Sequence, residues 1–220
     1  MLELGIDDAG RGPVIGPMVL AGCLIGSEKL PELKKLEVKD SKQITQKRRE
    51  FLAEKIKGLA ESFETEVVYP ENIDGDQEKG INLNDVEAIA CAKIINKLNN
   101  KQKIKVVIDC PSTSINKWKD FLKTKIDDLS NLEIVCEHKA DKNHLCVSAA
   151  SILAKCKREE EMKKLKEKYG EGIGSGYTSD PLTRRFLEKF AHKHKNDGIF
   201  RKSWITWKNA SGNLEQRKLV

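Results

Sequence analysis

Four aspartates lie where the sequence predicts strands to end or a helix to begin. Asp7 and Asp8 close an apolar N-terminal stretch, Asp109 closes the run Val-Val-Ile, and Asp141 precedes a long helical pattern. A carboxylate at the end of an apolar strand is costly to bury unless a cation compensates its charge. If these carboxylates converge, we expect one or two hard divalent cations with oxygen ligands, Mg²⁺ or Mn²⁺.

Each aspartate also has a purely structural interpretation. A strand-end aspartate is often a turn former or a helix cap, and Asp141 could be a favourable charge at a helix N-terminus. Asp7 and Asp8 face a geometric constraint as well, because neighbouring strand residues point to opposite faces of a sheet. Both can reach one site only if the strand ends there, and the glycines that follow them allow such an end.

The segment Gly10-Arg11-Gly12 comes directly after these carboxylates. Glycines let a backbone approach a ligand closely and expose its N–H groups, and Arg11 could contact a phosphate or a sugar hydroxyl. A tight hairpin turn would explain the same residues. Lys42 and Tyr177 are also candidate ligand contacts. Taken alone, Lys42 could equally be a surface lysine and Tyr177 a packed tyrosine of a loop.

Apolar periodicity predicts the elements that position these residues. We expect strands over residues 2–9, 14–25, 65–69, 105–109 and 132–137. Helical spacing covers residues 45–62, 84–98, 114–129, 144–169 and 182–195, and polar or glycine-rich loops are expected over 71–80 and 170–181. Strands come first and then alternate with helices, which predicts an α/β domain with a mixed sheet and a helical C-terminal portion.

The composition limits the class of protein. Of 220 residues, 39% are apolar, which is enough for a real core, and the net charge of +6 permits a basic face for a polyanion. An aromatic content of 5% argues against extended base stacking. No apolar stretch approaches ~20 residues and no secretion signal opens the chain, so we expect a cytoplasmic protein without a membrane span. The six cysteines form no CxxC pair and are expected to be free thiols.

Five sequence blocks, taken together, resemble the ribonuclease HII family. The first is Gly-Ile-Asp-Asp-Ala-Gly-Arg-Gly-Pro-Val-Ile-Gly-Pro-Met at 5–18, and the second is Asp-Ser-Lys at 40–42. The others are Asp109 after its strand, His-Lys-Ala-Asp with Val-Ser-Ala-Ala-Ser-Ile-Leu-Ala-Lys within 138–155, and Gly-Ser-Gly-Tyr-Thr-Ser-Asp-Pro at 174–181. The blocks occur in the family's order and are similar to those of archaeal members.

The resemblance implies an RNase H-like fold, in which a mixed β-sheet is flanked by helices. It implies a catalytic domain over 1–175 and a helical C-terminal extension over 176–220 packed on the substrate groove. The implied activity is endonucleolytic cleavage of RNA in RNA–DNA hybrids and incision at single ribonucleotides in duplex DNA. Two metal ions would support the hydrolysis, leaving 3′-hydroxyl and 5′-phosphate ends. We expect a monomer.

The resemblance also implies roles for individual residues. The family's four catalytic, metal-binding carboxylates match Asp7, Asp8, Asp109 and Asp141. Its loop that reads the ribose 2′-hydroxyl matches Gly10, Arg11 and Gly12, the tyrosine that packs on the sugar matches Tyr177, and a residue near the substrate phosphates matches Lys42. This chain departs from the family pattern at Asp8, where the family has Glu, and at Thr178, where it has Pro.

Other functions stay open from the sequence. The shorter Asp8 side chain could have disabled the chemistry and left a hybrid-binding module, and another RNase H-like nuclease such as a resolvase is a further alternative. His144 lies near Asp141 and could assist proton transfer. The tail from Gln216 faintly resembles a sliding-clamp peptide but lacks its aromatic pair, which favours a frayed end. Phosphate contacts or a solvated helix face would explain the C-terminal cations Lys189, Lys193, Lys195, Arg201, Lys202 and Lys208.

Overall fold

The computed structural model describes residues 1–38 and 44–216, with side chains described as far as residue 211. Each of its two compact units is assembled from three segments of the chain. Unit 1 comprises Met1–Ala9, Val19–Glu66 and Leu83–Lys157, and unit 2 comprises Gly10–Met18, Val67–Asn82 and Arg158–Val220. The predicted division into 1–175 and 176–220 stays a prediction.

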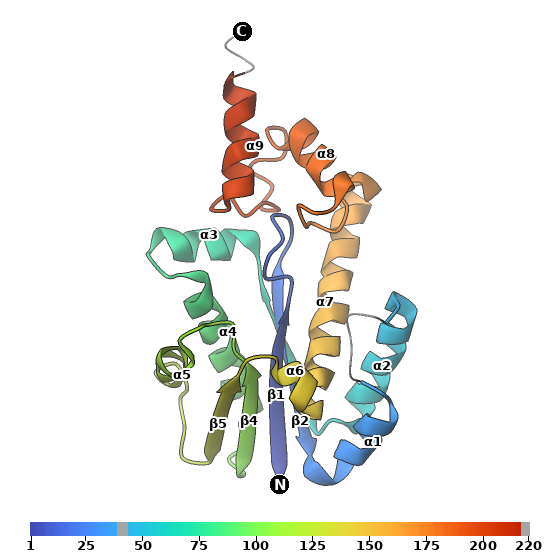
Figure 1. Ribbon diagram of the computed structural model, residues 1–220, viewed down its shortest axis with the longest axis vertical. Helices are drawn as coiled ribbons and strands as arrows, with labels where there is room; N and C mark the ends of the chain where they lie inside the picture. Colours follow the sequence, from blue (N-terminus) through green and yellow to red (C-terminus); the bar gives the residue numbers. More distant parts are fainter. Residues whose placement is uncertain (39–43, 217–220) are drawn as a thin grey trace. The chain divides into compact units, whose positions relative to one another are not determined.

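A five-stranded sheet in the order β3-β2-β1-β4-β5 forms the centre of unit 1 (Figure 1). Strand β1 is antiparallel to β2 and parallel to β4, which in turn is parallel to β5. The sheet is therefore mixed, as the sequence predicts. Its strands are β1 Leu2–Ala9, β2 Met18–Gly26, β3 Ser62–Val68, β4 Ile104–Asp109 and β5 Leu132–Glu137.

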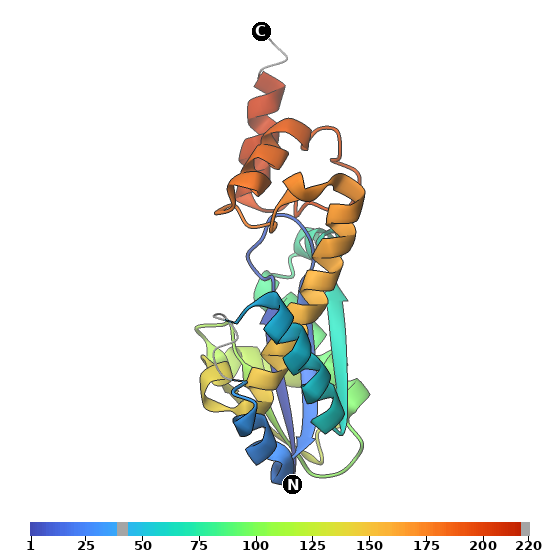
Figure 2. The same ribbon diagram turned by 90° about the vertical axis from the view of Figure 1, so that its right-hand side faces the viewer.

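Two glycines show how closely helices pack on the two faces of this sheet. A Cβ on Gly5 would overlap the backbone of Cys146 in α7, and a Cβ on Gly22 would overlap the Ile94 side chain in α4. Helices α1, α2 and the start of α7 bury apolar side chains on the Gly5 face. Figures 1 and 2 show α2 and α7 along one side of the sheet. The helices with residues in unit 1 are α1 Leu30–Lys35, α2 Gln46–Leu59, α4 Leu83–Leu98, α5 Ile115–Lys123, α6 Ala140–Asn143 and α7 Leu145–Tyr169.

Unit 2 has its own apolar core. Val14 and Ile15 from the segment between β1 and β2 are buried with Phe186 and with Phe200 and Trp207. The aromatic rings of Phe200 and Trp207 lie 4.5 Å apart between centroids. The unit contains the end of α7, the short helix η2 Glu171–Ile173, and helices α3 Pro70–Glu78, α8 Pro181–Phe190 and α9 Ile205–Gln216.

Three predictions about the elements are corrected by the structure. Residues 71–80 are not a loop, because Pro70 opens α3 and Ile73 is buried. A single apolar anchor is too weak a periodic signal for a helix. The second strand begins at Met18, since Val14 and Ile15 pack into unit 2 instead. Helix α4 begins at Leu83, one residue before the predicted start at residue 84.

Two predictions drawn from composition agree with the structure. All six cysteines lie among the described residues and are free thiols. Across residues 1–38 and 44–216, the helices are too short or too polar to traverse a lipid bilayer.

Candidate active site

Asp7 and Asp109 are neighbours near the carboxyl ends of the adjacent parallel strands β1 and β4. The parallel pairing of β1 with β4 runs from Leu2–Ile104 to Ile6–Ile108, and the two aspartates directly follow that last pair. Asp7 is only 7% exposed. Burial, together with the charges of Asp8 and Asp109, raises the pKa of its carboxyl to about 7, although a hydrogen bond from Ser151 opposes this rise. Asp7 thus carries a carboxylate whose negative charge is poorly compensated by the protein alone.

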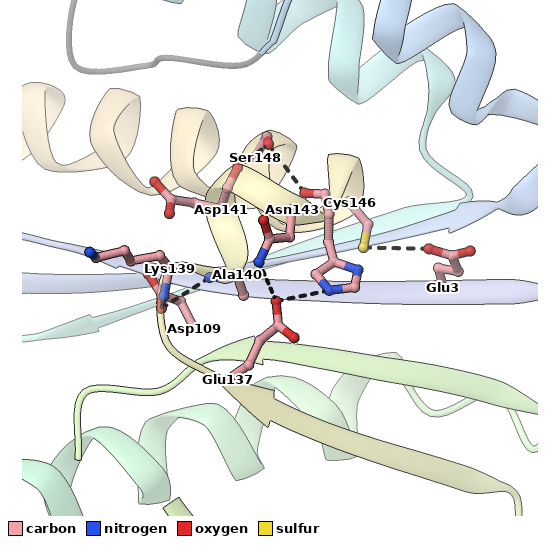
Figure 3. A network of polar contacts seen from close by, with 10 residues as sticks. Glu3, Asp109, Glu137, Lys139, Ala140, Asp141, Asn143, Cys146 and Ser148 are labelled. Carbon is pink, nitrogen blue, oxygen red and sulfur yellow. Dashed lines mark hydrogen bonds and ion pairs between the residues drawn. The ribbon is translucent and has the colours of Figure 1, made fainter. Parts of the chain in front are cut away.

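Asp109 is linked to the turn that carries Asp141. Its Oδ1 atom accepts hydrogen bonds from the backbone N–H groups of Lys139, at 2.7 Å, and Ala140, at 3.3 Å. Asp141 is the next residue, in α6, and its backbone carbonyl accepts from the Ser148 hydroxyl of α7. Figure 3 shows Asp109, Lys139 and Asp141 at the same end of this polar network. The structure therefore brings the strand-end and helix-start aspartates into one region of unit 1.

Asp8 lies on the other face of the sheet. Strand β1 covers residues 2–9 as predicted, so it continues past Asp8 to Ala9 and does not end at the two aspartates. Asp8 pairs with Leu20 of β2 and alternates with Asp7 across the pleat. Its charge is among the causes that raise the pKa of Cys91 in α4, after burial and the nearby Glu87 and Cys136. Asp8 is therefore oriented toward the α4 side, whereas Asp7 faces α7.

The donor chemistry suits a divalent cation, but the side chains are not arranged as a complete ligand set. Within the described parts of the chain, no three His, Cys, Asp or Glu side chains surround a common point as metal ligands. The fit therefore rests on hard carboxylate oxygens and on the buried Asp7 carboxyl, whose ionised form is opposed by the neighbouring charges of Asp8 and Asp109. A cation would relieve that opposition.

The Gly10-Arg11-Gly12 loop belongs to unit 2 and is held from the far end of the sequence. Arg201 is fully buried and donates to the carbonyl oxygens of Gly10 and Arg11, both at 2.6 Å, and of Gly16 at 3.0 Å. The prediction that Arg201 contacts phosphate or lies on a solvated helix face is therefore wrong. Because the guanidinium supplies only donors, it fixes a turn whose carbonyl groups point inward.

Tyr177 is joined to the same loop inside unit 2 through Arg158. The Arg158 guanidinium lies 5.1 Å from the centre of the Tyr177 ring and donates to the Ser175 carbonyl at 2.9 Å. A Cβ on Gly10 would overlap the Arg158 side chain, and one on Gly12 would lie 3.9 Å from Cε1 of Tyr177. Glycine is thus required at position 10, where φ is also +79°.

The loop after Tyr177 is closed by Asp180 rather than by a proline at 178. The Asp180 carboxylate accepts from Ser175 N at 2.7 Å and Leu182 N at 2.9 Å, and these bonds lower its pKa. Lys42, the remaining predicted substrate contact, lies outside the described residues. His144 pairs with Glu137, with Nε2 and Oε1 3.0 Å apart.

The sequence did not identify Arg158 as a functional candidate. Ser151 and Lys155 belong to a block that resembles the family, but the sequence predicted no individual role for either residue. One signal was present for the latter pair. Ser151 and Lys155 are four residues apart, on one side of a helix whose neighbouring residues are small and apolar. No comparable local signal marks Arg158, because its partners Gly10 and Tyr177 come from other segments.

Comparisons with known proteins identify the family and the fold of this chain. The family model of ribonuclease HII matches residues 4–207. A ribonuclease HII of Methanococcus maripaludis strain C7 is 44% identical, and the alignment covers 98% of this chain and 90% of the relative. Among solved structures, the ribonuclease H2 of Pyrococcus horikoshii is 35% identical with a TM-score of 0.88, covering 98% of this chain and 99% of that one.

A second solved structure, titled as the PCNA:RNase HII complex from Archaeoglobus fulgidus, is 39% identical with a TM-score of 0.81. It covers 93% of this chain and 95% of that chain. The expected RNase H-like fold, a mixed sheet with flanking helices, is confirmed by these matches. The chain belongs to the ribonuclease HII family, whose members are endonucleases of the ribonuclease H type 2 class.

Proposed function

We propose that this protein hydrolyses phosphodiester bonds of RNA in RNA–DNA hybrids and incises duplex DNA at single embedded ribonucleotides. The pairing that places the buried Asp7 carboxyl next to Asp109 is the observation that carries the proposal. The four proposed catalytic and metal-binding residues are Asp7, Asp109 and Asp141, together with Asp8, whose side chain begins on the opposite face of β1.

These carboxylates supply hard oxygen ligands for Mg²⁺ or Mn²⁺. When bound there, such ions would supply a nucleophilic water near neutral pH and would stabilise the leaving 3′-oxygen, and hydrolysis would then leave 3′-hydroxyl and 5′-phosphate ends. The protein's part is to hold the carboxylates. The backbone bonds from Lys139 and Ala140 fix one oxygen of Asp109 and leave its second oxygen outside this pair of bonds. Asp7 is oriented by Ser151 and by the N–H of Asp8, which donates to Oδ1 at 2.8 Å.

Recognition of the ribose is assigned to Gly10, Arg11, Gly12 and Tyr177. The 2′-hydroxyl distinguishes RNA from DNA, so a rigid group that senses it is required. Inward-pointing carbonyls, held by Arg201, support a loop that can present N–H groups to a ligand. Tyr177 is 38% exposed, which leaves ring surface for a sugar. Lys42 is assigned to the phosphates by resemblance alone.

The deciding experiment uses a DNA duplex that contains one ribonucleotide. We expect nicking 5′ or 3′ of that nucleotide with Mg²⁺ or Mn²⁺, no nicking with chelator, and no nicking of the all-DNA duplex. End analysis should find 3′-hydroxyl and 5′-phosphate groups. Binding of hybrid without cleavage in either metal would instead establish the hybrid-binding module, and cleavage of branched DNA alone would establish a resolvase.

Further expectations concern assembly and partners. We propose a monomeric cytoplasmic enzyme whose residues 176–220 contact the duplex. Clamp binding is supported by the likeness to a ribonuclease HII solved together with PCNA. The end of the predicted clamp peptide, residues 217–220, lies outside the described residues. Size-exclusion chromatography with and without a sliding clamp tests both points.

A further inference from the structure

Helix α7 lies directly against β1 at Gly5, and this contact determines which helix residue reaches Asp7. A Cβ on Gly5 would overlap the backbone of Cys146 and Val147. Asp7 follows Gly5 on the same strand face, about 6.5 Å further along. Ser151 follows Val147 by one helical turn, about 6 Å along the axis. The advance along the strand from Gly5 to Asp7 nearly equals the advance along the helix from Val147 to Ser151. In agreement with this, the Ser151 side chain is hydrogen bonded to Asp7.

Lys155 continues this arrangement by one more turn of α7. Its Nζ atom lies 2.9 Å from Oγ of Ser151. An ammonium group has donors only, so the lysine donates and the serine oxygen accepts. The single O–H of Ser151 is then available to donate to the Asp7 carboxylate. Hydrogen bonds therefore run in one direction, from Lys155 through Ser151 to Asp7.

We propose that Ser151 and Lys155 are positioning residues that fix the Asp7 carboxylate in the orientation that binds a divalent cation. The inference rests on the proposed function, in which Asp7 is a cation ligand. Ser151 is 1% exposed, so water does not compete for its hydrogen bonds. Groups that hydrogen-bond to a ligating side chain commonly change metal affinity by about 10- to 100-fold when they are removed.

The test measures cation binding in the absence of nucleic acid. Mn²⁺ affinity of the full chain is read from the electron paramagnetic resonance signal of free Mn²⁺. Ser151→Ala is expected to weaken binding about 10-fold, and Lys155→Met is expected to weaken it in the same direction. Lys155→Arg should restore most of the affinity, because it keeps a charged donor. Lys163→Met, which removes an exposed lysine of the same helix, should leave affinity unchanged.

Combining the substitutions separates positioning from a general effect of charge. If Lys155 acts through Ser151, Lys155→Met should add little to the loss already caused by Ser151→Ala. Independent, additive losses would overturn the relay. So would unchanged Mn²⁺ affinity in both single variants, or a loss confined to nucleic-acid affinity measured with chelator present. Thermal unfolding in chelator should show each variant to be folded.

Asp7→Asn distinguishes the failure of this inference from the failure of the proposed function. If Asp7→Asn abolishes Mn²⁺ binding while Ser151→Ala and Lys155→Met retain it, only the positioning roles are wrong. If Asp7→Asn itself binds Mn²⁺ as the parent does, the assigned metal site is wrong. In the expected case, Ser151→Ala has no further effect on affinity in the Asp7→Asn background.

Discussion

Asp7 and Asp109 occupy equivalent positions on the parallel strands β1 and β4, immediately after the paired residues Ile6 and Ile108. The two aspartates are about a hundred residues apart in the sequence and adjacent in the sheet. Each follows a buried isoleucine of its own strand, Ile6 or Ile108, so neither can move away from the other without disrupting the strands. This fixed proximity of two carboxylates underlies the predictions about catalysis and pH.

Asp109→Asn is expected to abolish most turnover while hybrid binding is retained. Asparagine can still accept from Lys139 N–H, but it supplies no second anionic oxygen. Losing several kcal/mol of transition-state stabilisation predicts a cleavage rate lower by at least about 100-fold. Single-turnover kinetics and hybrid titration measure the two effects. The matched control Asp127→Asn, at an exposed position, should behave as the parent, and full metal-dependent cleavage by Asp109→Asn would refute the role.

Asp7→Asn is expected to stabilise the metal-free protein increasingly as the pH rises. The pKa of Asp7 is raised from 3.8 to about 7, chiefly by burial and next by the charge of Asp8. The folded state therefore holds this proton more tightly than the unfolded chain. Its stabilising effect is complete below pH 3.8 and is lost as the pH rises through about 7.

Asparagine does not titrate, so the free energy of unfolding of the variant should exceed that of the parent by about 1–4 kcal/mol more at about pH 8 than at about pH 4. Urea unfolding in chelator measures this difference. A pH-independent difference between the two proteins would show that Asp7 titrates normally.

Asp8→Glu is expected to strengthen divalent-cation binding. Asp8 lies on the α4 side of the sheet, and its carboxylate is one methylene shorter than the glutamate of the family pattern. A longer side chain at position 8 can reach further around the carboxyl end of β1, toward Asp7 and Asp109. Calorimetric titration with Mn²⁺ measures the affinity, and the cleavage rate should rise with it. Identical affinity and rate in parent and variant would mean that the shorter side chain has no consequence.

Arg201→Met is expected to destabilise the protein by about 3 kcal/mol, because it leaves buried carbonyl oxygens of Gly10, Arg11 and Gly16 without their donor. Urea unfolding measures the loss. Arg184→Met is the matched control, since it removes an exposed arginine of α8 and should change stability by less than about 0.5 kcal/mol. Equal effects of the two substitutions would contradict the anchoring role.

Arg11→Ala is expected to weaken discrimination between ribonucleotide and deoxyribonucleotide sites without unfolding unit 2. Its backbone carbonyl, which binds Arg201, is retained in the variant. The ratio of kcat/KM for a ribonucleotide-containing duplex to that for the all-DNA duplex measures the effect. Arg185→Ala, which removes an exposed arginine of α8, should preserve the ratio. An unchanged ratio in Arg11→Ala would place ribose recognition elsewhere.

Local patterns in the sequence determined much of this protein. Period-two and helical spacing predict all five strands and most helices, and the matched blocks identify the family and the candidate carboxylates. These signals depend only on neighbouring residues, so they do not require knowledge of the fold. They do not predict α1, α6 or α9, and they fail at α3, where only Ile73 and the N-terminal Pro70 are buried.

The tertiary structure decided which of these residues meet. Parallel pairing of β1 with β4 makes Asp7 a neighbour of Asp109, and the continuation of β1 to Ala9 sends Asp8 to the opposite face. Arg201 contacts the Gly10 carbonyl across 191 positions of the chain, so a residue that looks like an exposed cation becomes a buried anchor. Such contacts depend on which strands pair and on which helix covers which face, and both relationships join segments that are far apart in the sequence.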